Sequence, residues 1–328
     1  MIDTLHWGII GCGNIAASFA KGLRDVDGAR LIAAASRSAQ KAARFSQENG
    51  ALRSYGSYED LLDDREIDVV YIATPHHLHM ENSLMAIEAG KHVLCEKPIS
   101  INSKQATRMA DAARQAGVFL MEGMWTRFIP AVEQLQDWLS DGIPGGIHLF
   151  TADFGVQFNV DDGHRIFNSE LGGGALLDLG VYPVSLASLI FKRQPDTIQT
   201  QVRMHATGVD ELNTMLFDYK SGPLAVITSG SISRTPTEAF IAGKKLSIKI
   251  HSPLYCPSAL TLFKPDGTSD SYEFPLEGNG FNYEAAHVCR CLRKGMLQSD
   301  VMPVSESISI METLDSIRAQ WGLRYPMD

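Results

Sequence analysis

Three residues have side chains that could transfer a proton or carry a charge at positions typical of an active site, namely Lys97, Asp178 and Tyr182. Lys97 lies in HVLCEKPISI, where an apolar strand ends in Glu96, Lys97 and Pro98. Ligands of open α/β sheets bind at such strand ends, although a lysine there is often only solvated. Asp178 and Tyr182 are four residues apart in a run with helical apolar spacing, so they share one helix face. Alone, the pair also fits a capped helix with a half-buried tyrosine.

The elements that position these residues follow from the pattern of the chain. From Leu5 onward, short apolar runs alternate with helix-like stretches, which indicates right-handed βαβ units and a parallel sheet. We therefore predict a doubly wound Rossmann domain over residues 1–123. Residues 124–328 are rich in β-branched and aromatic runs, which indicates an α+β domain with a large, open, mostly antiparallel sheet. The final amphipathic segment predicts a closing helix that packs back on the first domain.

A glycine turn follows the first predicted strand in WGIIGCGNIAASFAKGL. Gly11 suits a tight turn, and Gly13 lets the backbone approach a pyrophosphate at a helix N-terminus. Ala16 replaces the third glycine of the dinucleotide fingerprint and is small enough for close helix–strand packing. The turn, with Asn14 and Ile15, predicts a nicotinamide dinucleotide site.

The end of the second predicted strand favours NADP(H) as the cofactor, with NAD(H) as the alternative. An NAD-specific protein usually carries an acidic residue there, whereas this chain has Ser36 and Arg37. Arg37 could pair with a 2′-phosphate, Ser36 could hydrogen-bond to it, and Lys41 adds positive charge one helical turn onward. The alternative interpretation is a solvated helix start, but cations at a helix N-terminus oppose its dipole.

The third strand ends in Thr74 and Pro75, followed by three histidines. We expect Thr74 and Pro75 to shape the loop beneath the nicotinamide half of the cofactor, and His79 to begin the next helix, with a structural or a cofactor-binding role. His76, His77 and His79 lack an acidic or cysteine ligand at the spacing of known zinc sites, so we expect no metal.

The bulk composition restricts the class of protein. The chain has 328 residues, of which 45% are hydrophobic and 20% charged, and it has no apolar run near the roughly 18 residues of a membrane span. The net charge of −9 argues against nucleic acid or anionic lipid as a partner. The first residues do not resemble a secretory signal, and the 5 cysteines fit reduced thiols. We therefore expect a cytoplasmic protein.

The motifs GCGNIA, ATPHHLH, CEKP, MWTRFIPA and LGGGALLDLGVYPV together resemble the glucose-fructose oxidoreductase and inositol dehydrogenase (Gfo/Idh/MocA) family, most closely its dimeric dihydrodiol dehydrogenase branch. The resemblance implies a two-domain oxidoreductase that uses NAD(P)H and forms a homodimer or homotetramer through the second sheet. It also implies that Lys97, after Glu96, contacts the nicotinamide ribose and the substrate, and that the Lys97–Pro98 bond is cis. Tyr182 matches the sugar and dihydrodiol branches, whereas many relatives carry histidine there.

On this basis we expect reversible hydride transfer between NADP(H) and a hydroxyl or carbonyl carbon of a sugar, cyclitol or vicinal diol. Tyr182 would exchange the proton, Lys97 would favour its phenolate, and Asp178 would orient the substrate or hold Lys97. The candidate substrate-pocket residues are Trp125, Arg127, Phe154, Arg165 and Phe281, although core packing fits either phenylalanine and Arg165 could brace the glycine turn. Two alternatives are a non-catalytic NADP-binding regulator and a tetrapyrrole or imine reductase on the same scaffold.

Overall fold

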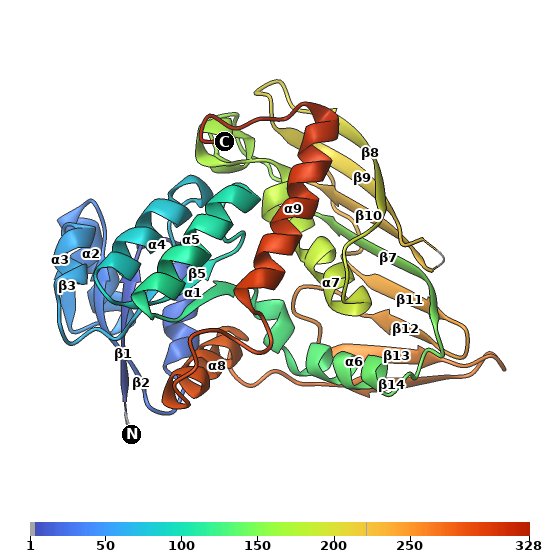
Figure 1. Ribbon diagram of the computed structural model, residues 1–328, viewed down its shortest axis with the longest axis horizontal. Helices are drawn as coiled ribbons and strands as arrows, with labels where there is room; N and C mark the ends of the chain where they lie inside the picture. The colour runs from blue at the N-terminus through green and yellow to red at the C-terminus, as the bar shows by residue number, and fades with distance from the viewer. Residues whose placement is uncertain (1–3, 221) are drawn as a thin grey trace. The chain divides into compact units, whose positions relative to one another are not determined.

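The computed structural model describes residues 4–220 and 222–328, which form two compact units (Figure 1). The first unit comprises Met1–Trp125 and Glu277–Ile308, and the second comprises Thr126–Leu276 and Ser309–Asp328. The chain first passes from one unit to the other after Trp125, close to the expected boundary at Gly123. The chain also returns to the first unit over Glu277–Ile308, which the sequence pattern assigned to the second domain.

The first unit is built on a parallel sheet of six strands in the order β3-β2-β1-β4-β5-β6. The strands are β1 (Leu5–Ile10), β2 (Ala29–Ala35), β3 (Arg53–Tyr55), β4 (Val69–Ile72), β5 (His92–Glu96) and β6 (Leu120–Gly123). Strand β4, VVYI, is wholly buried, as expected when helices cover both faces of a parallel sheet. The order reverses between β1 and β4, and doubly wound sheets bind their ligands at such a switch point.

Three helices of the first unit begin after a residue whose side chain caps the helix. The helices of this unit are α1 (Asn14–Leu23), α2 (Ala39–Asn49), α3 (Tyr58–Leu62), α4 (His79–Glu88), α5 (Ser103–Ala116), α8 (Phe281–Arg293) and the short η1 (His76–Leu78). The side chains of Ser38, Ser57 and Asn102 cap α2, α3 and α5. Helix α8 packs closely on α1, because a Cβ added at Gly22 would lie 2.9 Å from the Cβ of Phe281.

The second unit is built on an eight-stranded sheet in the order β14-β13-β12-β11-β7-β10-β9-β8. Its strands are β7 (Ile147–Gly155), β8 (Thr197–Met204), β9 (Asp210–Asp218), β10 (Leu224–Gly230), β11 (Ala239–Gly243), β12 (Ser247–Ile250), β13 (Ala259–Phe263) and β14 (Ser269–Glu273). Only the β7–β10 pair is parallel among the described strands of this sheet. The predicted α/β class and mostly antiparallel second sheet are confirmed.

Helices α6 (Pro130–Ser140), α7 (Val181–Phe191) and α9 (Val304–Trp321) lie along one face of this sheet in Figure 1. The short helical turns of this part of the chain are η2 (Trp125–Phe128), η3 (Arg165–Phe167), η4 (Ser169–Leu171) and the π-helical η5 (Leu176–Gly180). The run Ser169–Phe191 is long and apolar enough to cross a membrane, contrary to our expectation that no such segment exists. Of its apolar 18-residue window, 94% is buried within the protein. That burial is typical of a core helix.

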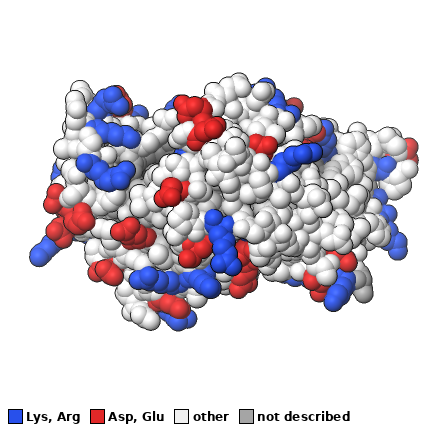
Figure 2. All heavy atoms as spheres, turned by 90° about the horizontal axis from the view of Figure 1, so that it is seen from above, with Lys and Arg blue, Asp and Glu red and all other residues white. Residues whose placement is uncertain are grey.

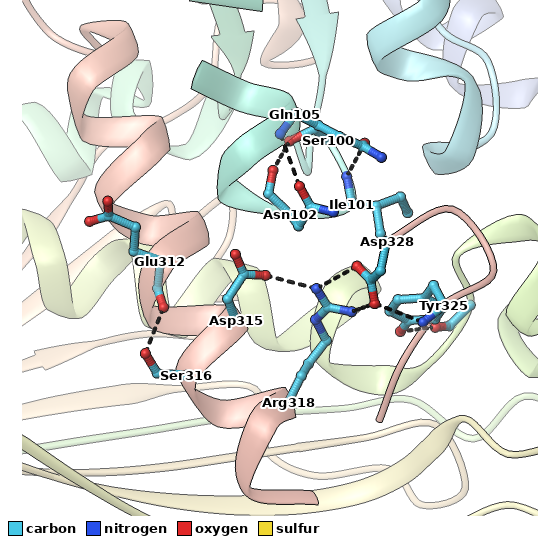
Figure 3. A network of polar contacts seen from close by, with 11 residues as sticks. Ser100, Ile101, Asn102, Gln105, Glu312, Asp315, Ser316, Arg318, Tyr325 and Asp328 are labelled. Atoms are coloured by element: carbon cyan, nitrogen blue, oxygen red, sulfur yellow. Dashed lines mark hydrogen bonds and ion pairs between the residues drawn. The ribbon is translucent and has the colours of Figure 1, made fainter. Parts of the chain in front are cut away.

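The C-terminal residues hold the glycine turn of the second unit through a polar network (Figure 3). Arg318, which is almost fully buried, donates to Asp315 at 2.7 Å and to Asp328 at 3.0 Å. Asp328 also accepts a hydrogen bond from the backbone N–H of Tyr325, and the hydroxyl of Tyr325 donates to the carbonyl oxygen of Gly173 at 2.5 Å. The chain end therefore fixes the backbone that leads into η5.

Charge is distributed without a dominant sign on the face that Figure 2 shows. Lysine and arginine side chains there are interspersed with aspartate and glutamate across uncharged surface. This pattern provides no broad basic surface on that face for a polyanion.

Candidate active site

The glycine turn has the geometry of a dinucleotide cradle. Gly11 has φ +98°, and a Cβ there would lie 2.6 Å from the carbonyl oxygen of Ala73, so only glycine fits. A Cβ at Gly13, the N-cap of α1, would meet no atom within 4 Å. The first turn of α1 contains no acidic residue and begins with the exposed Asn14 and Ile15. This open, uncapped N-terminus fits a pyrophosphate, and the fully buried Ala16 provides the close packing expected of a third glycine.

The N-terminus of α2 carries exposed cations beside the end of β2. Arg37 and Lys41 are exposed, and the first turn of α2 contains no acidic residue. The Ser38 hydroxyl accepts from the backbone N–H of Lys41, and the buried Ser36 hydroxyl accepts from the backbone N–H of Ser38. The two serines shape the turn, while the guanidinium and ammonium groups face solvent, where a phosphate could meet them.

His79 begins α4 as expected, and its contacts in the structure correspond to the structural one of its two expected roles. Its side chain has no exposed surface. Its Nδ1 lies 2.7 Å from the carbonyl oxygen of Pro98, and its Nε2 lies 2.8 Å from that of Thr74. Because both ring nitrogens contact the backbone, His79 braces the ends of β4 and β5 instead of reaching a cofactor. Thr74 is held a second time, since its hydroxyl accepts from the side-chain amide of Asn82 at 3.0 Å.

Lys97 is half-buried directly after β5, and the Lys97–Pro98 bond is cis as the resemblance implied. Glu96 beside it is buried, accepts a hydrogen bond from the backbone N–H of Lys97 at 3.1 Å, and accepts another from the hydroxyl of Tyr71. Glu96 is therefore a positioning residue for the Lys97 backbone. Burial raises the pKa of Glu96 to about 7, although Tyr71 and Lys97 lower it.

Glu284 on α8 is a second buried carboxyl group in the first unit. It has no exposed surface, and neither carboxyl oxygen has a hydrogen-bond partner among the described residues. A Cβ placed at Gly123 would lie 3.5 Å from the Cα of Glu96 and 3.6 Å from Oε2 of Glu284, so the two carboxyl-bearing residues flank the end of β6. Burial and then the charge of Glu96 raise the pKa of Glu284 well above its usual value.

Replacing Glu284 by glutamine should stabilise the protein at pH 8 more than at pH 5. The folded state keeps the Glu284 proton to a higher pH than the unfolded state, so stability falls as pH rises above the unfolded pKa of about 4.3. Glutamine removes this loss, which is about 1.4 kcal/mol for each unit of pKa difference. Thermal unfolding of both proteins at the two pH values measures the change, with the exposed Glu88→Gln as control. An equal fall in Tm at both pH values would contradict the expectation.

In the second unit, Asp178 is paired with Arg165. The two nitrogens Nη1 and Nη2 donate to Oδ1 and Oδ2 at 3.0 and 3.1 Å. Asp178 lies in the π-helical turn η5, an irregularity frequent at functional sites, and its side chain is 6% exposed against 46% for Arg165. Arg165 also interacts electrostatically with the phenol of Tyr182. The structure thus identifies Arg165 as a cation beside both residues, a role that sequence reasoning left undecided.

An aromatic cluster surrounds Tyr182, which lies in the first turn of α7. The ring centroids of Phe154 and Tyr182 are 5.5 Å apart, and Tyr255 lies 5.6 Å from Tyr182 and stacks on Phe154 at 5.0 Å. Phe154 was expected in the pocket, but Tyr255 was not identified from the sequence. Its segment, IHSPLY, resembles an ordinary strand end. It follows β12, which is separated from β7 by β11 in the sheet, so no local sequence signal links Tyr255 to Phe154.

Three other expected pocket residues have packing roles in the structure. Arg127 is 5% exposed and donates to the carbonyl oxygen of Ser185 at 3.0 Å, so its assignment to substrate is revised to a structural one. Trp125 and Phe281 belong to the first unit, where their rings stack at 4.5 Å. Lys97 also belongs to the first unit, whereas Asp178 and Tyr182 belong to the second.

The Rossmann unit with its open glycine turn, together with a tyrosine beside an arginine–carboxylate pair, defines the class of nicotinamide-dependent oxidoreductases. Residues 5–124 match the model of an oxidoreductase family with an NAD-binding Rossmann fold, and residues 132–249 match the GFO/IDH/MocA C-terminal domain. The chain therefore belongs to the Gfo/Idh/MocA family. It is an oxidoreductase that acts on CH–OH groups.

The chain is also similar over its full length to individual proteins of known name. The chain is 37% identical over 333 residues to trans-1,2-dihydrobenzene-1,2-diol dehydrogenase of Mus musculus, with 99% of each chain covered. It is 35% identical over 337 residues to the Homo sapiens enzyme of that name, again with 99% of each covered. Among solved structures, KijD10, a 3-ketoreductase from Actinomadura kijaniata in complex with NADP and TDP-benzene, has a TM-score of 0.86 and 26% identity, with 96% of this chain and 97% of that chain covered.

Proposed function

We propose that this protein is an NADP(H)-dependent oxidoreductase that transfers hydride to or from a hydroxyl or carbonyl carbon of a vicinal (dihydro)diol, sugar or cyclitol. The observation that carries the proposal is the phenol of Tyr182 beside the rings of Phe154 and Tyr255. It occurs in a chain that is similar over its full length to dihydrodiol dehydrogenases. Aromatic rings suit an aryl diol or the apolar face of a sugar, and the paired Asp178 and Arg165 offer hydrogen bonds to hydroxyl groups.

In this mechanism each residue has a separate task. Gly11, Gly13 and the N-terminus of α1 would hold NADP(H), which would supply or accept the hydride when bound. Tyr182 gives a proton to the substrate oxygen in reduction and takes it back in oxidation, and the cationic Arg165 beside it favours the phenolate. Asp178 keeps Arg165 in place. The backbone N–H of Lys97 is held by the carboxyl group of Glu96. The ammonium group of Lys97 would contact the nicotinamide ribose and the substrate oxygen.

The choice of cofactor is tested by replacing Arg37 with alanine. Because Arg37 is exposed just before the N-terminus of α2, we propose that its guanidinium pairs with the 2′-phosphate of NADP(H). Loss of a charge-assisted hydrogen bond of about 1.5–3 kcal/mol predicts a KM for NADPH roughly 10- to 100-fold higher, with the KM for NADH unchanged. Arg44→Ala on the same helix is the matched control. An equal rise in both KM values would contradict the assignment.

The substrate class is tested by following NADPH absorbance with aryl vicinal diols, sugars, cyclitols and dicarbonyl compounds. We expect turnover with at least one hydroxyl or carbonyl class. Turnover confined to imines or linear tetrapyrroles would overturn the proposed substrate class while leaving the oxidoreductase class intact.

We also propose that two copies associate through the face of the second sheet opposite α7. Exposed apolar side chains there include Leu224 and Val226, at 42% and 37% exposure. A hollow of about 370 Å³ beside them is lined by Thr151, Ala152, Asp153, Val226, Thr228, Pro236, Glu238, Ala239, Phe240 and Lys249. An apolar surface ringed by polar groups is typical of a protein interface, and the mass in solution by light scattering decides between monomer, dimer and tetramer.

A further inference from the structure

Three ligand-type side chains meet at one point on α8 and the segment that follows it. His287 and Cys291 are four residues apart on α8 and therefore share a helix face. Asp300 joins them, and the candidate ligand atoms of all three residues lie within 4.8 Å of one another. His287 and Cys291 are each about 1% exposed, whereas the Asp300 side chain is 66% exposed. The cluster is thus buried on the helix side and open to solvent on the other.

The spacing of the atoms fits a tetrahedral metal ion. Nε2 of His287 lies 3.3 Å from Sγ of Cys291 and 3.6 Å from Oδ1 of Asp300. Zinc bonds of about 2.0–2.1 Å to nitrogen, 2.3 Å to sulfur and 2.0–2.2 Å to oxygen place two ligands of a tetrahedron about 3.3–3.6 Å apart. The two measured separations fall in this range. The third, between Sγ of Cys291 and the carboxylate of Asp300, lies within 4.8 Å, and the exposed Asp300 side chain can turn to close the difference.

We propose that His287, Cys291 and Asp300 form a Zn²⁺ site of this protein. One imidazole, one thiolate and one carboxylate are ligands that zinc accepts, and the two anions balance its charge. On binding, the Cys291 thiol loses its proton to solvent as the sulfur–zinc bond forms, and water fills the fourth position on the exposed side of Asp300. No oxidant or further reactant is needed.

The hydrogen bonds of the metal-free cluster show what zinc must displace. Nη2 of Arg290 lies 2.6 Å from Nδ1 of His287, and the Ser299 hydroxyl lies 2.7 Å from Nε2. Zinc on Nε2 requires the imidazole proton on Nδ1, so Arg290 must turn away, which its exposed position allows. Ser299 also accepts from the backbone N–H groups of Val301 and Met302 at 3.0 and 2.8 Å. These bonds fix the backbone beside Asp300 independently of a metal.

This arrangement predicts opposite effects for two substitutions. Cys291→Ser removes the thiolate and should weaken Zn²⁺ binding at least 100-fold. Arg290→Ala removes both a competing donor on Nδ1 and a nearby positive charge, so it should tighten binding several-fold. Cys289→Ser is the matched control, since Cys289 is equally buried on α8 but lies outside the cluster.

The experiment adds Zn²⁺ alone to the chelator-treated full chain and measures stoichiometry and Kd by competition with a chromophoric chelator. We expect one equivalent, a rise in Tm with Zn²⁺, and a thiolate-to-cobalt charge-transfer band with Co²⁺ that Cys291→Ser abolishes. Should Cys291→Ser fail to fold, Asp300→Asn at the exposed ligand replaces it, with an expected loss of at least 10-fold. No bound equivalent, no thiolate band, or the same loss in Cys289→Ser would overturn the proposal.

Discussion

Replacing Lys97 by methionine should lower kcat about 10³-fold or more while the protein remains folded. Removal of one group that stabilises developing charge typically costs 10²–10³ in kcat, and Lys97 is proposed to serve the nicotinamide ribose as well as the substrate. Methionine keeps most of the apolar stem of the half-buried lysine, and the backbone N–H that donates to Glu96 is unchanged. Steady-state kinetics with saturating NADPH and the best substrate measure the effect, and circular dichroism confirms the fold.

Lys104 offers the matched control for this substitution. It is an exposed lysine in the first turn of α5, so Lys104→Met should leave kcat within about twofold of the parent, as expected for a solvated surface side chain. Near-normal turnover by the Lys97→Met protein would remove Lys97 from the mechanism. A fall of equal size in both variants would show that the effect is not specific to the end of β5.

Replacing Tyr182 by phenylalanine should lower kcat by about 10²–10⁴-fold, the usual contribution of a positioned acid–base group. The ring remains, so its packing against Phe154 and Tyr255 is preserved and the stability should change little. The ionisation that belongs to the phenol should disappear from the pH dependence of kcat/KM. A purely structural tyrosine would leave the shape of that profile unchanged.

Tyr255→Phe distinguishes the two tyrosines of the cluster. Tyr255 stacks on Phe154, whereas the phenol of Tyr182 interacts electrostatically with Arg165. We therefore expect Tyr255→Phe to change KM for the substrate more than kcat. If Tyr255→Phe instead produced the larger loss of kcat and altered the pH profile, the proton-transfer role would move to Tyr255.

The fold could be predicted from the sequence where the relevant signals are local. Alternating apolar runs and the glycine turn at Gly11 each act over a few residues, so the parallel sheet could be predicted from them. The strand order, with its switch point between β1 and β4, depends on contacts between distant segments and came only from the structure. The return of Glu277–Ile308 to the first unit has no such signal. An amphipathic helix shows that it has a buried face, but its sequence does not say which surface covers that face.

The site shows the same limit at the level of side chains. Residue type and spacing identified Lys97, Asp178 and Tyr182 as candidates. They did not predict the bidentate pairing of Asp178 with Arg165, because two residues 13 apart across a glycine turn have no fixed geometry. His79 was expected to have a structural or a cofactor-binding role and Arg127 to line the substrate pocket, because their chemistry suits such contacts. In the structure each side chain is buried and contacts hydrogen-bond partners within the protein. Residue type does not reveal this burial.

The return of the chain over Glu277–Ile308 has a consequence for how the protein is made. During synthesis the parallel sheet emerges first, yet the surface of α1 around Gly22 stays uncovered until α8 has left the ribosome. All of Thr126–Leu276 must be translated in that interval. We therefore expect the nascent first unit to expose the α8-facing surface of α1 until then, a condition that favours association with chaperones. A fragment that ends at Trp125 would carry the same exposed surface permanently and should aggregate instead of binding nucleotide.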